Sequence, residues 1–420
     1  MAIDGYRHQV LRTLLAGALC AVLVAPVAPA APATAAPAPR KIAHTGWTSG
    51  ADLRTGDLQG VAVSRGQLVV DAPVAMRSYA GRRYDVARWV SPWRSPGFDL
   101  TELIASWDAR TPGNSWIEVQ VRGRTGSGRT SSWDVLGRWA AGDRFIRRTS
   151  VPAQGDDLAG VAVDTWKTST GLAAWQLRVL LMRGQGAPGP QVDGIGAVVS
   201  RLPRVSDVAT SDPGTGAGIV LPVPRYSQMV HSGDYQRWGG GGEAWCSPTS
   251  TSMVLGRYDA LPPARAYRWV TDGHVDPWVD HAARMTYDAS YGGTGNWPFN
   301  TAYAATRTDD AFVTRLRNLR EARVLIEAGI PLVASIAFDR GELSNAPISA
   351  SNGHLLVIVG FTRSGDVVVN DPAARTRSGV RRTYDRGQFE DAWLPTSGGL
   401  VYVIHDHAHP LPDPARHSNW

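Results

Sequence analysis

Residues 243–255 read EAWCSPTSTSMVL, and this stretch decides how the second half of the chain is interpreted. Pro248 suits the first turn of a helix, where the N–H that proline lacks would have no intrahelical partner. The apolar residues 253–255 would then begin the buried side of the helix. The pattern predicts a helix over 247–258 with Cys246 at its N-terminus, where the helix dipole favours thiolate over thiol. A buried structural cysteine that happens to precede a helix is the alternative.

A thiolate nucleophile needs a base and a group that orients the base. His354 stands at the start of residues 355–361, an apolar stretch that predicts a buried strand. Beyond the next turn, Asn370 and Asp371 precede a proline, and either could hold one imidazole nitrogen so that the other faces sulfur. Taken singly, these residues have ordinary explanations, a structural histidine and an Asp-Pro turn. Together with Cys246 they predict a catalytic set.

The second half of the chain, from about residue 219 to 405, resembles a known peptidase family. It is similar to the secreted branch of the bacteriocin-processing (double-glycine peptidase-like) family, the thirty-ninth family of papain-fold cysteine peptidases. The elements that carry the resemblance occur in the family's order: VPRYSQ at 223–228, CSPTS at 246–250 with Met253, AGIPLV at 328–333, Gly353-His354 before its apolar strand, and NDP at 370–372.

The resemblance implies a papain-like α+β fold and a role for each motif. Cys246 would be the nucleophile, His354 the general base and acid, and Asp371 the group that orients the imidazole. A glutamine upstream of the cysteine would donate to the oxyanion. In the implied mechanism the Cys246 thiolate attacks a peptide carbonyl, His354 protonates the leaving amine, and water hydrolyses the thioester.

The sequence departs from the family pattern at two places. Ser247 stands where the family commonly has glycine, which could narrow access to sulfur or supply an extra hydroxyl. Gln228 lies eighteen residues before Cys246, with residues 231–242 apparently inserted, whereas Gln236 lies ten before it. The motif context favours Gln228 as the side-chain donor to the oxyanion, with the backbone N–H of Cys246 as the second donor.

Three functions are compatible with these residues, and a secreted cysteine peptidase acting on a peptide or protein substrate is the leading one. A cell-wall amidase or endopeptidase would use the same chemistry, although the WCSP of residues 245–248 does not match the Asp-Cys-Ser-Gly usual in such enzymes. The third is a non-catalytic glycan-binding protein with an inactive peptidase-like domain.

Length and composition limit the classes of protein. The chain has 420 residues and a mass of 45.1 kDa, which indicates two or three domains. Its 43% apolar and 19% charged residues exclude wholesale disorder. No run of eighteen apolar residues follows the first thirty, which excludes a multi-span membrane protein. The net charge of +6 comes without a basic block, so nucleic acid is not an expected partner.

Residues 1–35 predict a secretory signal peptide. They combine two early arginines, an apolar stretch over 11–25, and small residues at 33–35 that offer a cleavage site. We therefore expect a secreted, extracellular protein with no membrane span after cleavage. Cleavage would also remove Cys20, and a remaining lone Cys246 would be a buried hydrophobe, an intermolecular bridge or a reactive thiol.

Short alternating stretches predict that residues 41–203 form an all-β sandwich, which we expect to be jelly-roll-like. The small polar residues 204–218 indicate a linker, 219–405 a peptidase domain of α+β type, and 406–420 a C-terminal tail. The expected strands of the first domain are 66–70, 116–122, 160–166, 175–183 and 192–200. The expected elements of the second are helices at 247–258 and 318–328, the latter stopped by Gly329, and strands at 332–338, 355–361, 367–370 and 399–404.

Aromatic residues suggest two places for ligands. The glycine-rich loop at 292–300 carries Trp297 and Phe299, which could line a substrate groove or pin the loop by packing. In the first domain we expect most tryptophans to fill the core, although exposed ones could stack on a cell-wall glycan. These residues are Trp47, Trp89, Trp93, Trp107, Trp116, Trp133, Trp139, Trp166 and Trp175.

The sequence predicts no metal site and no cofactor. His405, His407 and His409 alternate and would share one face of a strand, but no cysteine or fixed carboxylate evidently accompanies them. His274 and His281 are interpreted as structural or surface residues.

Overall fold

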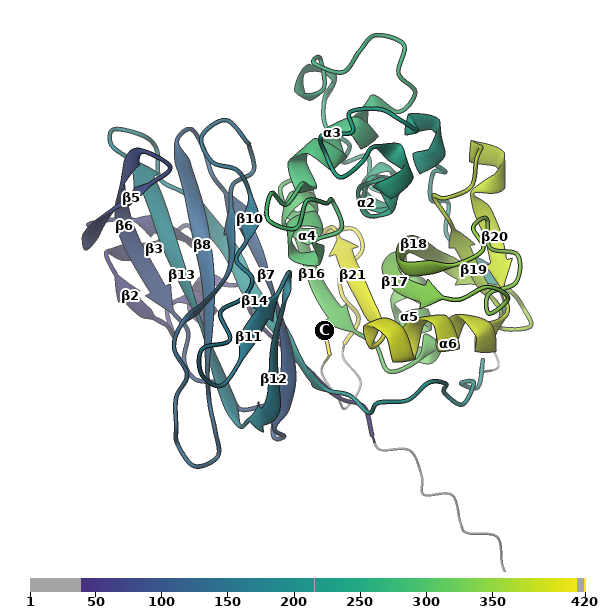
Figure 1. Ribbon diagram of the computed structural model, residues 1–420, viewed down its shortest axis with the longest axis horizontal. Coiled ribbons are helices and arrows are strands. Elements are labelled where there is room, and N and C mark those ends of the chain that lie inside the picture. The colour runs from purple at the N-terminus through teal and green to yellow at the C-terminus, as the bar shows by residue number, and fades with distance from the viewer. Residues whose placement is uncertain (1–38, 215, 414–418) are drawn as a thin grey trace, which may run out of the picture. The chain divides into compact units, whose positions relative to one another are not determined.

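Alternating apolar and polar residues build two antiparallel β-sheets of seven strands each, which form the β half of the structure (residues 41–201; Figure 1). The first sheet contains β1 (Lys41–Trp47), β3 (Val61–Ser64), β4 (Gln67–Val70), β7 (Leu100–Arg110), β11 (Gly160–Ala162), β12 (Thr165–Leu172) and β14 (Gln191–Arg201). The second contains β2 (Asp57–Gln59), β5 (Ala75–Tyr79), β6 (Arg82–Val90), β8 (Ser115–Arg124), β9 (Asp134–Trp139), β10 (Thr149–Ser150) and β13 (Ala174–Gly184). The short helix α1 spans Gly50–Leu53.

The computed structural model describes residues 39–214, 216–413 and 419–420, so the predicted signal peptide (1–35) lies outside the described residues. Within those residues, the structure has no helix long and apolar enough to cross a membrane.

The two sheets face each other around a shared apolar core, to which both contribute. Seven of the nine tryptophans are at most 2% exposed, as expected for core residues. The other two, Trp93 and Trp133, are half-buried, and the Arg122 guanidinium lies 5.1 and 4.5 Å from their ring centroids. Their faces are therefore partly covered by a side chain of the protein itself.

One expected strand of the β half is two strands. The sequence predicts a continuous strand over 160–166, but β11 ends at Ala162 and β12 begins at Thr165. Ala162 pairs with Thr165 across a two-residue turn. Val163 in this turn has a φ of 54°, a conformation that β-branched residues rarely adopt.

A third sheet, also of seven strands, organises the mixed half (residues 219–405). Its strand order is β16-β21-β17-β18-β19-β20, and β15 pairs with β18. The strands are β15 (Ile219–Val220), β16 (Asp310–Arg315), β17 (Leu332–Phe338), β18 (Ser351–Phe361), β19 (Val367–Asn370), β20 (Arg381–Tyr384) and β21 (Leu400–His405).

Helices cover both faces of this sheet, with α2 and α3 on one side and α5 and α6 on the other (Figure 1). The α-helices are α2 (Cys246–Arg257), α3 (Pro277–Thr286), α4 (Trp297–Ala305), α5 (Leu319–Glu327) and α6 (Arg386–Ser397). The 3₁₀ turns are η1 (Gln228–His231), η2 (Gly242–Ala244), η3 (Ala264–Ala266) and η4 (Arg377–Gly379). The mixture is α+β, as expected.

Most predicted elements of the mixed half are confirmed. The strands at 332–338 and 367–370 match β17 and β19 residue for residue. The helix over 247–258 is α2, and the helix over 318–328 is α5, after which Gly329 turns the chain with a φ of 83°. The loop expected at 292–300 is wrong in its last part, because α4 begins at Trp297.

The β half and the mixed half pack against each other within the single unit formed by residues 39–420. Phe299 of α4 joins the core between the two β sheets, where its ring lies 6.1 Å from that of Trp107. Arg315 of β16 donates to Ser200 at 2.6 Å and forms an ion pair with Glu102, both in the β half. The boundary between the halves is therefore apolar and also contains buried polar contacts.

Both segments expected to be a linker and a tail are anchored. Within 204–218, the Ser211 backbone N–H donates to Glu390 of α6 at 2.6 Å, and Arg386 donates to the Ser211 carbonyl at 2.6 Å. Within 406–420, Asn419 is 1% exposed and donates to the Arg315 carbonyl at 2.9 Å.

Candidate active site

Cys246 is the first residue of α2 and is half-buried. The residue before it, Trp245, is fully buried, and its indole donates to the Trp238 carbonyl at 2.7 Å. Within the described residues, no side chain caps the start of α2. The N–H groups of its first turn therefore direct the positive end of the helix dipole toward the Cys246 thiol.

Ser247 does not face the cavity beside Cys246. It is fully buried, and its hydroxyl lies 2.9 Å from the Tyr402 hydroxyl of β21. Ser247 therefore does not supply an extra hydroxyl near the Cys246 sulfur, because its hydroxyl is hydrogen-bonded to β21.

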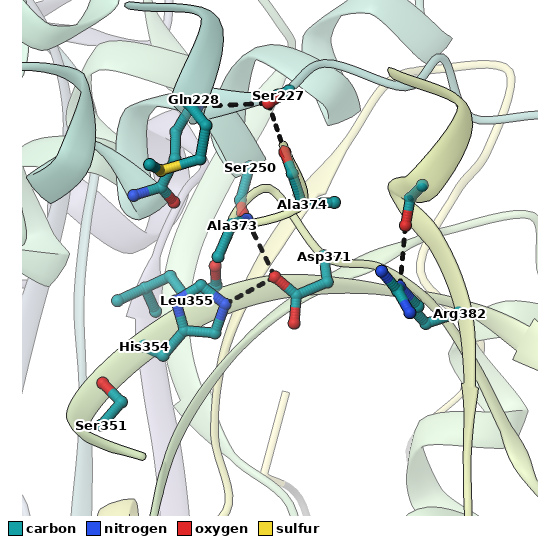
Figure 2. A network of polar contacts seen from close by, with 12 residues as sticks. Ser227, Gln228, Ser250, Ser351, His354, Leu355, Asp371, Ala373, Ala374 and Arg382 are labelled. Atoms are coloured by element: carbon teal, nitrogen blue, oxygen red, sulfur yellow. Dashed lines mark hydrogen bonds and ion pairs between the residues drawn. The ribbon is translucent and has the colours of Figure 1, made fainter. Parts of the chain in front are cut away.

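His354 and Asp371 are brought together by neighbouring strands. His354 lies in β18, and Asp371 directly follows β19, which pairs with β18. His354 Nε2 is 2.8 Å from Asp371 Oδ1, and both residues are buried (Figure 2). Asp371 Oδ1 also accepts from the Ala373 backbone N–H at 2.9 Å, and Oδ2 accepts from the Tyr384 hydroxyl at 2.7 Å. The carboxylate is thus fixed by three donors and leaves Nδ1 of the imidazole for another partner.

The electrostatics of this pair favour a charged imidazole. Burial acts to lower the pKa of His354, but the Asp371 carboxylate and the nearby Cys246 side chain outweigh it and raise that pKa to about 10. Burial also acts to raise the pKa of Asp371, yet His354, Tyr384 and the Ala373 N–H together hold it below its ordinary value. The shifted pKa values therefore favour an imidazolium next to a carboxylate, with the Cys246 side chain nearby.

Asn370, the other candidate to orient His354, is used elsewhere. Its amide donates to the Pro224 carbonyl at 2.9 Å and its oxygen accepts from Arg381 at 2.6 Å. Asn370 therefore ties β19 to the segment before η1.

Gln228 begins η1 and lines the same cavity as Cys246 and His354. Its backbone N–H donates to the Pro372 carbonyl at 2.9 Å, which joins η1 to the Asp371 turn. Its side-chain Nε2 donates to the Glu243 carbonyl at 2.7 Å, which leaves one amide hydrogen for the cavity. Gln236, in contrast, is exposed and is absent from the cavity wall.

The glycine run before α2 lets the inserted segment fold tightly. Gly239, Gly240 and Gly241 have φ values of 78°, 98° and 96°, which favour glycine strongly. At Gly242, a Cβ would lie 2.3 Å from the His231 carbonyl carbon. The run therefore brings the chain close against η1 just before Cys246.

The cavity encloses about 710 Å³ and receives residues from both halves of the protein. The mixed half contributes Gln228, Cys246 and His354, and the β half contributes Val163 and Lys167 from the β11–β12 hairpin. The hairpin is fixed there, since Asp164 accepts from the Trp297 N–H at 3.1 Å. Nothing in the local sequence of this hairpin indicates a role in the site, because only the tertiary fold places it beside Cys246.

The two aromatic residues proposed to bind substrate have different surroundings. Trp297 lies in the cavity wall. Phe299 is 1% exposed and packs in the core of the β half, so it does not line the groove that the sequence suggested. The cause is the first turn of α4, which points these two side chains in different directions.

His405, His407 and His409 do not converge. They lie near different carboxylates, Asp310 at 3.9 Å, Asp309 at 2.7 Å and Asp406 at 2.7 Å respectively. Tyr384 donates to Asp371, a role that nothing near it in the sequence indicates.

Family models match both halves of the chain. A family model described as the peptidase C39 N-terminal domain matches residues 43–200, and one described as the Peptidase_C39 like family matches residues 220–401. A solved structure described as a putative C39-like peptidase from Bacillus anthracis is similar at 16% identity and a TM-score of 0.29, over 45% of this chain and 98% of that one. No curated protein matches. The two family matches confirm the resemblance found in the sequence, and the chain belongs to the peptidase C39 family.

Proposed function

We propose that this protein is a secreted cysteine peptidase that hydrolyses peptide bonds through Cys246, His354 and Asp371. One observation carries the proposal: His354 is bonded to Asp371 at 2.8 Å in the wall of a cavity that also holds Cys246 at a helix N-terminus. Membership of the C39 family supports a peptidase over the alternatives of a cell-wall amidase and an inactive glycan-binding protein. The predicted signal peptide supports action outside the cell.

The geometry suggests a role for each group during the reaction. The Cys246 thiolate attacks the peptide carbonyl, while the Cys246 backbone N–H and Gln228 Nε2 stabilise the oxyanion. His354 gives its proton to the leaving amine, and a thioester remains on Cys246. Water then attacks the thioester, with His354 taking one proton, and the acid product leaves as the thiolate reforms. Asp371 keeps the imidazole oriented throughout.

We further propose a papain-like fold for the mixed half and a jelly-roll-like sandwich for the β half. A thiol at a helix start, with its histidine and carboxylate on adjacent strands, supports the first. Two facing antiparallel sheets, in which strands from distant parts of the sequence are neighbours, support the second.

We also propose that the β half forms part of the wall that binds a peptide or protein substrate. The β11–β12 hairpin lines the cavity with Val163 and Lys167. Stacking of a cell-wall glycan on tryptophans is less favoured, because seven of the nine are buried and Arg122 partly covers the other two.

The proposal is tested by profiling the mature chain with a peptide library and comparing kcat/KM on the best substrate among variants. Cys246→Ala should abolish cleavage, and His354→Ala should lower kcat/KM by about a thousandfold or more. His407→Ala, whose side chain is 91% exposed, is the matched control and should leave cleavage unchanged. Equal cleavage by Cys246→Ala and the parent chain would overturn the proposal.

A further inference from the structure

Two histidines and two aspartates converge outside the cavity. They are His231 at the end of η1, Asp234, His274, and Asp280 of α3. His231 Nδ1 is 3.2 Å from Asp280 Oδ2, and His274 Nδ1 is 3.3 Å from Asp234 Oδ2 and 3.5 Å from Asp280 Oδ1. His231 Nδ1 is also 3.9 Å from Asp234 Oδ2. One ligand atom each from His231, Asp234 and Asp280 lies within 4.8 Å of the other two. His274 Nδ1 borders this group and approaches Asp280 through the other carboxylate oxygen.

The buried members of this cluster lack hydrogen-bond partners. His231 is 1% exposed and Asp280 is fully buried, yet within the described residues neither imidazole nitrogen nor either carboxylate oxygen forms a hydrogen bond. His274 Nδ1 is unpartnered in the same way. Burying polar groups without hydrogen bonds lowers the stability of the folded state. The atoms are close together but not aligned for hydrogen bonds, which indicates that they face a shared point rather than one another.

The spacing fits a tetrahedral metal ion. Bonds of about 2.0–2.2 Å from zinc to imidazole nitrogen and carboxylate oxygen place the ligand atoms about 3.3–3.6 Å apart. The separations of 3.3 Å (His274 to Asp234) and 3.5 Å (His274 to Asp280 Oδ1) lie in this range. The 3.2 Å between His231 and Asp280 Oδ2 lies just below it, and the 3.9 Å between His231 and Asp234 lies above it. Imidazole ligands favour zinc and similar transition metals over calcium and magnesium, which prefer oxygen. Two carboxylates also balance the charge of a divalent ion.

We propose that His231, Asp234, His274 and Asp280 form a binding site for one zinc-class divalent cation. Four protein ligands would complete its coordination, which is typical of a structural site rather than a catalytic one. None of the four lines the cavity around Cys246. The side chains of Asp234 and His274 are 29% and 20% exposed, so an ion can enter from this side. The neighbouring Asp276 pairs with Arg377 through Oδ1 and does not belong to the group of close ligand atoms.

The cation would join the inserted segment to the body of the mixed half. His231 and Asp234 belong to residues 231–242, whereas His274 and Asp280 come from the loop before α3 and from α3 itself. The His231 ring also lies 6.0 Å from that of Trp245, which directly precedes α2. The site therefore explains how a glycine-rich insertion is held in one conformation beside Cys246.

The test uses the full, untagged mature chain carrying Cys246→Ala, so that the thiol cannot bind zinc and a failure of the peptidase proposal leaves this test unaffected. Metal is removed with a chelator, zinc is titrated back against a chromogenic competitor, and bound metal is counted by mass spectrometry. We expect one zinc per chain and a rise in melting temperature on zinc addition. His274→Ala, at the exposed side, and the isosteric Asp280→Asn should each weaken zinc binding by more than about 100-fold, since even outer-shell changes cost 10–100-fold.

His407→Ala in the same background is the matched control and should bind zinc as the parent does, because its imidazole lies outside the cluster. Circular dichroism of metal-free His274→Ala should match that of the metal-free parent. A parent chain that takes up no zinc would overturn the proposal, as would equal affinity in His274→Ala and the parent.

Discussion

The ion pair between His354 and Asp371 makes folding stability depend on pH. The folded-state pKa of His354 is raised from 6.5 to about 10, so protonation favours the folded state. Its stabilising contribution is complete below about pH 6.5 and is lost as the pH rises through about 10. Asp371 has a lowered pKa, so its contribution is present above the ordinary aspartate pKa and is lost in acid.

Asp371→Asn should therefore destabilise the protein in a pH-dependent way. We expect its melting temperature to fall furthest below that of the parent between about pH 5 and pH 6.5, and the gap to narrow toward about pH 10. Thermal unfolding of both chains across this range measures the gap. Asp309→Asn, beside the exposed His407, is a matched control with little expected effect. A gap that stays constant with pH would show that the ion pair does not titrate as inferred.

At the scale of elements, η1 and η2 position the proposed oxyanion donor. A Cβ on Gly242 would lie 2.3 Å from the His231 carbonyl carbon and 2.5 Å from the Gln228 carbonyl oxygen. Both are backbone atoms, so η1 itself would have to move. The backbone carbonyl of the next residue, Glu243, accepts from Gln228 Nε2 at 2.7 Å. A side chain at position 242 would therefore disturb both the backbone of Gln228 and the hydrogen bond of its side chain.

Gly242→Ala should lower kcat by about 100-fold, the typical cost of losing one oxyanion donor, with a smaller change in KM. Gly240→Ala is the matched control: its φ is 98°, and a Cβ there would meet open space. Both variants should lose about 1–3 kcal/mol of stability, one from overpacking and the other from backbone strain. Steady-state kinetics distinguish them, and an equal kcat in both would contradict the role of Gln228.

The elements also show what the sequence can and cannot predict. β17 and β19 are predictable because each is an apolar run too short for a typical helix, with turn residues on both sides. α4 was expected to be a loop because the preceding glycines dominate the pattern. A helix forms because the Asn296 side chain accepts from the Phe299 N–H, with proline in the first turn, which is a signal that the sequence does contain.

Some residues of the candidate site are also predictable from the sequence, and others are not. Cys246, His354 and Asp371 each lie in a recognisable local motif, so their candidacy follows from the sequence. Tyr384 reaches Asp371 only through the folding of β20 beside β19, and nothing in its local sequence marks this contact. The His231–Asp280 pair joins residues far apart in the chain, and each has an ordinary sequence context.

At the scale of the whole molecule, the two halves share apolar cores. Phe299 and Ala302 of α4 belong to the core of the β half, while Ile42 and Ile104 of the β half belong to that of the mixed half. An independent accessory domain would instead keep its core to itself. The shared cores imply that the β half and the mixed half unfold in one transition.

Phe299→Ala tests this coupling, because it removes a mixed-half side chain from the β-half core. We expect a loss of about 3–5 kcal/mol, the usual cost of a buried phenylalanine. Tryptophan fluorescence reports on both halves, since the β half holds nine of the sixteen tryptophans, whereas circular dichroism at helical wavelengths reports on the mixed half. Both signals should shift together by the same amount.

Val324→Ala, at a position 40% exposed on α5, is the control and should stay within about 0.5 kcal/mol of the parent. Separate transitions by the two probes would mean that the halves are stable independently and that the cavity wall is assembled from two folding units.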